Sequence, residues 1–185
     1  MTRAADKAAL NRLLLERSVK RGDFVLASGR RSAFYIDARL TTMSAAGLVL
    51  IGRFGLDALR ERGWAPQSVG GLTMGADPVA YALATASAAA PPVIDAFSVR
   101  KEPKGHGTGR RIEGNFTPGT QVVVVEDVLT TGGSALTAVE AIREGGGTIL
   151  GVLVVVDREE GGRTAVEGQG IEVVSITTAT ELGLH

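Results

Sequence analysis

The residues best suited to chemistry follow a short apolar run. Val122–Val125 is four consecutive valines, and Glu126 and Asp127 come directly after it. A turn rich in Thr and Gly then leads into a segment with helical spacing; its residues are Val128, Leu129, Thr130, Thr131, Gly132, Gly133 and Ser134. At such a helix entrance, free backbone N–H groups and the positive end of the helix dipole favour a phosphate. Because the glycines let the backbone approach the oxygens and the hydroxyl side chains add donors, the loop is predicted to bind a phosphate monoester.

The two adjacent acids have to contact something other than the phosphate, because carboxylates repel it. Vicinal ribose hydroxyls or a bound Mg²⁺ are suitable partners for Glu126 and Asp127. A ligand with a phosphate, a diol and a metal is a phosphorylated ribose. The alternative is that one acid only caps the turn, but this does not explain two acids in a row before such a loop.

A second polar segment, 100–114, has the sequence RKEPKGHGTGRRIEG. Its first twelve positions hold five Lys or Arg and one Glu. Such a stretch is uncommon inside a compact domain unless it is disordered or a working loop. We interpret it as a mobile loop over an anionic ligand, hinged at its glycines; a solvated surface loop is the alternative and the commoner origin of a charge run. Lys104 and His106 are two residues apart, so both can face one side of an extended loop.

Two common nucleotide motifs do not apply. No Lys follows Gly132 and Gly133, so the loop is not a Walker A motif, which needs GxxxxGK[ST]. The string GHGTG at 105–109 imitates a dinucleotide fingerprint, but it lies in a charged segment rather than between a strand and a helix.

The elements that must position these residues alternate along the chain. Short apolar runs predict strands, and segments with helical spacing predict helices. The expected strands are 68–72, 92–99, 121–127, 148–157 and 171–177, and the expected helices are 6–20, 44–62, 75–90 and 134–144. Runs that are apolar on both faces belong to a parallel sheet covered by helices on both sides. The predicted fold class is therefore α/β with a central parallel sheet.

The N-terminal part follows another pattern. After the first helix, residues 23–37 predict two short strands around a turn at 28–31. Neither an internal repeat nor a linker divides the chain, so we expect a single domain over residues 1–185.

Composition excludes several classes of protein. Lys plus Arg and Asp plus Glu number 20 each in 185 residues, so no global field attracts nucleic acid or an anionic membrane. The absence of Cys excludes disulfides, a thiol nucleophile and a Cys-based metal site. The N-terminus lacks the apolar stretch of a signal peptide, and the segment 79–90 is short and followed by two prolines, so we expect a cytoplasmic protein.

With these features in place, Glu126–Ser134 resembles the motif of the type I phosphoribosyltransferases, which handle phosphoribosyl pyrophosphate (PRPP). Three further matches narrow the resemblance to the orotate phosphoribosyltransferase family. Arg100–Gly107 is similar to that family's catalytic loop, RKExKxHG. Gly22–Asp37 is similar to its N-terminal base-binding hood. Asp157-Arg158 stands where the family places an Arg that meets orotate.

The resemblance implies an enzyme that transfers the 5-phosphoribosyl group from PRPP to orotate. The products are orotidine 5′-monophosphate and pyrophosphate, in de novo pyrimidine (UMP) biosynthesis. It implies a type I phosphoribosyltransferase fold, with a small hood formed mainly by residues 1–40 and the catalytic loop at 100–114. It also implies Mg²⁺, bound mainly through PRPP and with Glu126 and Asp127 as candidate contacts, and a homodimer with shared active sites.

The resemblance further assigns roles to residues. PRPP would be bound by residues 126–134 and by the loop residues Arg100, Lys101, Lys104 and His106, which would neutralise the departing diphosphate and could protonate it. Orotate would meet Arg158, whose planar guanidinium suits a carboxylate or a pair of carbonyls, together with Thr130 and Tyr35. For Arg158, the alternative is a surface Arg at the end of a strand.

The chain departs from the family pattern at two cations. Many members carry Lys where this sequence has Ala27, and many carry Tyr-Lys-Gly where it has Thr73-Met74-Gly75. Two other functions are alternatives: a phosphoribosyltransferase for another nucleobase, which would not need the RKExKxHG loop, and a regulator that senses PRPP. A regulator usually adds a nucleic-acid-binding surface, for which the first 20 residues are too short.

Overall fold

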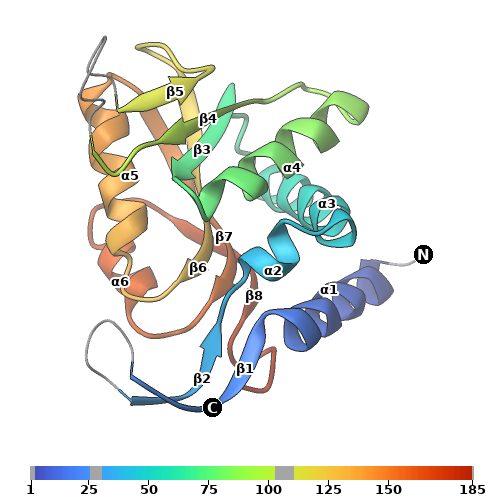
Figure 1. Cartoon of the computed structure of the whole chain (residues 1–185). Helices are drawn as coiled ribbons and strands as arrows, with labels where there is room; N and C mark the ends of the chain where they lie inside the picture. The colour runs from blue at the N-terminus through green and yellow to red at the C-terminus, as the bar shows by residue number, and fades with distance from the viewer. Residues whose placement is uncertain (1–2, 26–30, 103–110, 185) are drawn as a thin grey trace.

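The computed structural model describes residues 3–25, 31–102 and 111–184, and its centre is a six-stranded sheet (Figure 1). In spatial order the strands are β5 (Ile112–Gly114), β4 (Asp95–Val99), β3 (Ser68–Leu72), β6 (Gln121–Leu129), β7 (Thr148–Asp157) and β8 (Val173–Thr178). All neighbours pair in parallel except β5, which pairs antiparallel with β4 at one edge. The predicted fold class is confirmed, with one antiparallel edge strand that had not been predicted.

Helices cover both faces of the sheet. Figure 1 shows α3 (Ala45–Glu61) and α4 (Ala76–Ala89) on one side, and α5 (Gly133–Glu144) and α6 (Gly162–Glu167) on the other. Along β6 the side chains alternate between two buried clusters. Val123 and Val125 belong to the cluster under α3 and α4, whereas Val122 and Val124 belong to the cluster under α5. Burial on both faces explains why this strand is a continuous run of Val.

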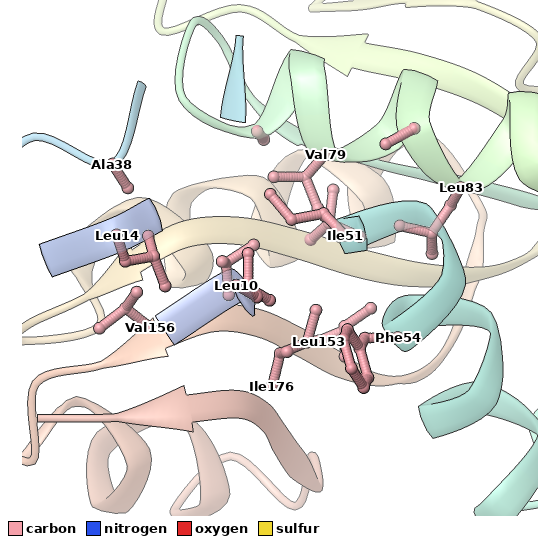
Figure 2. Packing of buried hydrophobic residues seen from close by; sticks show 14 of the residues in the cluster. Leu10, Leu14, Ala38, Ile51, Phe54, Val79, Leu83, Leu153, Val156 and Ile176 are labelled. Atoms are coloured by element: carbon pink, nitrogen blue, oxygen red, sulfur yellow. The ribbon is translucent and has the colours of Figure 1, made fainter. Parts of the chain in front are cut away.

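The first cluster also holds the N-terminal helix. In Figure 2, Leu10 of α1 (Arg3–Arg17) is drawn near Ile51 and Leu153, and Leu14 near Ala38 and Val156; all belong to the same buried cluster. Leu10 and Leu14 are both fully buried. The apolar stripe of the first helix is therefore what joins the N-terminal segment to the sheet.

After α1 the chain forms a separate two-stranded antiparallel sheet. It consists of β1 (Val19–Val25) and β2 (Arg31–Ile36), followed by the short helix α2 (Arg39–Thr42). A hydrogen bond of 2.7 Å between the hydroxyl groups of Ser18 and Thr41 joins the two ends of this hairpin. The hairpin thus projects beyond the sheet from a fixed base.

Most predicted elements are present, with shifted ends. The first helix spans 3–17 rather than 6–20, because β1 already begins at Val19. The segment 100–114 was predicted to lack regular structure, but its last residues form β5. A strand of three mostly polar residues has no alternation to detect, and it forms here because the edge of β4 offers hydrogen bonds. The helices α2 and α6 were also not predicted, because each is too short to show a helical repeat of apolar residues.

Candidate functional site

A cavity of about 880 Å³ opens at the carboxyl ends of the central strands. This is where open α/β sheets bind ligands. Its walls come from β2, the β3–α4 loop, the end of β6 with the loop to α5, and the residues after β4 and β7. Nine residues predicted from the sequence line it: Tyr35, Lys101, Glu126, Asp127, Val128, Thr130, Thr131, Ser134 and Arg158.

The two acids of β6 lie at the floor of this cavity. Glu126 is only 5% exposed, and burial raises its pKa well above the ordinary value, with further contributions from the negative charge of Asp127 and a hydrogen bond to it. Burial also raises the pKa of Asp127, although the backbone N–H of Val128, which donates to its Oδ1 at 2.9 Å, opposes this. One buried and one partly buried carboxylate side by side form a site for a cation or for hydroxyl donors.

The loop from β6 to α5 has the geometry of an anion site. Gly132, the N-cap of α5, has φ 86° and ψ −3°, and a Cβ there would lie 3.0 Å from the carbonyl oxygen of Gly162. Only glycine adopts this left-handed conformation at low cost. No side chain of the described residues caps α5. The backbone N–H groups of its first turn are therefore available to a ligand beside Thr130, Thr131 and Ser134.

Three residues of the predicted loop do not face the cavity. Leu129 is buried in the core under α5, where it packs with β6 and β7. Gly132 and Gly133 shape the turn, but they are not among the residues that line the cavity. Their contribution is to the backbone path.

The β3–α4 loop forms the opposite wall with Thr73, Met74 and Gly75. Asp77, at the start of α4, holds this loop in place: its carboxylate accepts hydrogen bonds from the Thr73 hydroxyl at 2.6 Å and from the Ser98 hydroxyl at 2.7 Å. A Cβ at Gly75 would lie 2.8 Å from Cγ of Asp127. The glycine therefore lets this loop approach the β6 carboxylates closely.

Arg158 is buried at the other end of the cavity, and its side chain is 2% exposed. Its guanidinium carbon lies 4.6 Å from the centre of the Phe34 ring, and Nη2 donates to the Ser32 hydroxyl at 3.2 Å. Nη2 also lies 2.7 Å from Oε1 of Glu160. The alternative of a surface Arg is thus wrong, because the hairpin covers this residue.

Two further charged residues line the cavity, Asp37 and Arg39. Two side-chain hydrogen bonds join them, from Nε of Arg39 at 2.8 Å and from Nη2 at 3.0 Å, and the backbone N–H of Arg39 donates to Asp37 at 3.3 Å. The hydrogen bond from Arg39 lowers the pKa of Asp37, and the same pairing raises that of Arg39, to which the charge of Asp127 also contributes. Asp37 belongs to the hood segment identified in the sequence, whereas Arg39 was not predicted to line the site. The alternation of Tyr35, Asp37 and Arg39 was the available signal.

The polar loop is only partly described. Lys101 lines the cavity, whereas Arg100 forms an ion pair with Glu113 at 3.2 Å and is not part of the lining. Lys104 and His106 lie outside the described residues, as does Ala27.

Comparison with known proteins extends this picture. Residues 49–177 match the family described as phosphoribosyl transferase domain. Over 180 residues the chain is 47% identical to an orotate phosphoribosyltransferase of Aquifex aeolicus, and the aligned region covers 96% of this chain and 97% of that protein. An orotate phosphoribosyltransferase of Rhodopirellula baltica is 43% identical over 184 residues, 97% of this chain and 95% of that protein.

A solved structure is similar over nearly the same span. It is the crystal structure of an orotate phosphoribosyltransferase of Mycobacterium tuberculosis in complex with PRPP. The TM-score is 0.82 at 42% sequence identity, with 97% of this chain and 99% of that chain covered. The likeness therefore includes the N-terminal hairpin as well as the sheet.

Proposed function

Because the chain belongs to the phosphoribosyltransferase family, and within it to the orotate phosphoribosyltransferases, we propose that it transfers the 5-phosphoribosyl group of PRPP to orotate. The products are orotidine 5′-monophosphate and pyrophosphate, in pyrimidine biosynthesis. The observation that carries this proposal is the presence, in one cavity, of a helix entrance for a phosphate, two carboxylates and a guanidinium.

Each part of PRPP has a suitable partner in the cavity. The 5-phosphate suits the first turn of α5, with the hydroxyl groups of Thr130, Thr131 and Ser134. Its ribose diol suits Glu126 and Asp127, whose carboxylates accept hydrogen bonds from hydroxyl groups. In this arrangement the carboxylates also stabilise positive charge that develops on the ribose ring as pyrophosphate leaves.

Orotate is assigned to the other end of the cavity. Arg158 offers a planar donor for its carboxylate, and Thr130 and Tyr35 line the same cavity. Phe34 holds the guanidinium from one face, so the donor is oriented before orotate arrives. Preorientation of this kind reduces the entropy lost on binding.

The departing diphosphate is assigned to the cations of the polar loop. Lys101 lies in the cavity lining, and Arg100, Lys104 and His106 belong to the same segment of the sequence. Their charge compensates the negative charge on the leaving oxygen, and a Lys or His can supply a proton. Arg39 adds a cation on the side of Asp127. This chain has Ala27 and Met74 at positions where many family members carry a cation.

The residues present fit Mg²⁺ as a partner of PRPP rather than as a resident metal. Among the described parts of the chain, no group of three or more His, Cys, Asp or Glu could hold a metal ion. Glu126 and Asp127 offer two carboxylates, fewer ligands than Mg²⁺ takes, so the diphosphate would supply the rest. When bound, Mg²⁺ neutralises charge on the diphosphate.

We also propose a homodimer, with the catalytic loop of one subunit reaching its partner's site. A group of large apolar side chains supports this: Leu40 on α2, Met43 directly after it, Met74 just before α4 and Tyr81 on α4 are each about half exposed. The helices α2 and α4 are in contact, so these side chains can form one surface. Sedimentation of the protein with and without Met43→Lys tests this, with a shift to monomer expected for the variant.

The proposed setting is the cytoplasm, as one domain over residues 1–185. Within the ranges that the structure covers, no helix has both the length and the apolar character needed to cross a membrane.

The test of the function is a substrate panel. Purified protein with PRPP and Mg²⁺ should consume orotate, followed by its absorbance, and should not use adenine, hypoxanthine or uracil at comparable rates. Lys104→Ala should collapse turnover with the fold intact, and Arg158→Ala should weaken the affinity for orotate. Turnover of another base in preference to orotate would overturn the assignment.

A further inference from the structure

The Arg158 guanidinium is engaged by an acid of its own chain. Oε1 of Glu160 lies 2.7 Å from Nη2, and both residues line the cavity. The same nitrogen also donates to the Ser32 hydroxyl. The ion pair is largely shielded from solvent, because the side chain of Arg158 is 2% exposed and that of Glu160 is 16% exposed.

One donor of this guanidinium has no partner among the described residues. Nε of Arg158 is buried and makes no hydrogen bond. A buried donor without an acceptor costs free energy, so such groups in proteins are usually satisfied by a ligand or by water. Since Arg158 lies on the cavity wall, a ligand in the cavity can supply this acceptor.

The turn after β7 presents Glu160 to Arg158. Glu159 has φ 60°, and its carboxylate turns the other way, where it accepts a hydrogen bond from the backbone N–H of Thr180 at 2.7 Å. Asp157 accepts the backbone N–H of Glu159 at 2.8 Å. Gly161, at φ 95°, is the N-cap of α6. With both flanking residues held, Glu160 is placed against the guanidinium by the local backbone.

We propose that Glu160 competes with the substrate carboxylate for Arg158 and thereby makes the site selective for an anionic base. The inference rests on the proposed binding of orotate by Arg158. Glu160 engages Nη2 and leaves Nε without an acceptor, whereas a carboxylate that bridges Nε and a terminal nitrogen makes two parallel hydrogen bonds. Orotate therefore gains a bond that Glu160 does not make, and it displaces Glu160 from the guanidinium.

A neutral base cannot make this exchange on equal terms. A pyrimidine without a carboxylate offers Arg158 no charge in return, so the ion pair with Glu160 stays in place. Displacing it would separate a nearly buried carboxylate from the Arg158 guanidinium, which is costly. The device weakens orotate binding somewhat and weakens the competitors more, which is how specificity is gained through repulsion as well as attraction.

The test is Glu160→Gln. The amide oxygen can still accept from Arg158, so the guanidinium stays oriented while the competing charge is lost. The KM for orotate is expected to fall about fivefold, the worth of one charge-assisted hydrogen bond of modest strength, through KM rather than kcat. The KM for PRPP is the internal reference. Glu160→Ala should shift the KM for orotate in the same direction.

Glu167→Gln is the matched control, since this exposed glutamate pairs with Arg163 on α6 away from the cavity. Uracil, as a competitive inhibitor, is the neutral probe, and its inhibition constant should fall more than about fivefold in Glu160→Gln, because a base without a carboxylate gains most when the charge that it cannot replace is removed.

The two levels of the proposal fail differently. If the unaltered protein does not turn over orotate, the proposed function fails. If it does, and the KM for orotate in Glu160→Gln is unchanged or raised, Glu160 only positions Arg158 and the competition is overturned. A gain for uracil that is equal to or smaller than the gain for orotate would overturn it as well.

Discussion

Glu126→Gln should make the protein more stable while it weakens PRPP binding. Glu126 is 5% exposed, and burial, the charge of Asp127 and a hydrogen bond to Asp127 all raise its pKa, with no cation among the causes. The amide has nearly the same shape and its N–H₂ can donate to Asp127. Removing an uncompensated buried charge of this kind is worth about 2 kcal/mol, since the penalty per buried ion is of the order of a few kcal/mol.

The gain depends on pH in a definite direction. Because the pKa of Glu126 is raised in the folded state, the folded chain keeps a proton that the unfolded chain releases once the pH exceeds the ordinary Glu value. The free energy of unfolding therefore falls as the pH rises through the window between the two values, and the deficit is complete above the folded value. Glu126→Gln removes this deficit, so the two proteins should differ little at pH 4.5 and most at pH 8.

Thermal unfolding at several pH values measures this. A gain of about 2 kcal/mol corresponds to an increase in Tm of about 4–8 °C for a chain of this size. Addition of PRPP with Mg²⁺ should raise the Tm of the unaltered protein more than that of the variant, because the ribose diol loses an ionisable acceptor. Glu140→Gln, at an exposed position on α5, is the control and should change neither the Tm nor the increase in Tm caused by PRPP. A Tm at pH 8 that is unchanged or lower in Glu126→Gln would refute the reasoning.

Three other perturbations have defined outcomes. Gly75→Ala brings a methyl group 2.8 Å from Cγ of Asp127, so kcat/KM for PRPP should fall about tenfold or more in steady-state kinetics; a normal value would show that the loop can move away. Asp77→Asn loses one of the two hydrogen bonds by which Asp77 holds Thr73 and Ser98, so the KM for PRPP should rise about threefold. A normal KM in Asp77→Glu would show that the exact position of the carboxylate does not matter. Chelation by EDTA should abolish turnover and added Mg²⁺ should restore it, whereas full activity in EDTA would exclude the metal.

The sequence determined the parts of this protein that depend on neighbouring residues. A run of four valines followed by two acids specifies a buried strand with its polar end at the carboxyl edge, and β6 is found there. Glycines and hydroxyl residues at the entrance of α5 specify a helix start with free N–H groups. Periodicity located α3, α4 and α5 to within a few residues. These features follow from strand alternation, helical spacing and turn chemistry, which act over a few positions.

The tertiary structure decided which distant residues meet. Ser32 and Arg158 are 126 positions apart in the sequence and share a hydrogen bond. Nothing in the sequence around Ser32 predicts this contact. That contact depends on α1 packing its leucines under the sheet, which carries the hairpin over the end of β7. Likewise, Gly75 meets Asp127 only because β3 and β6 are neighbours, an order that no periodicity encodes. Local patterns therefore predicted the phosphate end of the site, whereas sheet order and helix packing set the pairing of Arg158 with Glu160 and the covering of the base end.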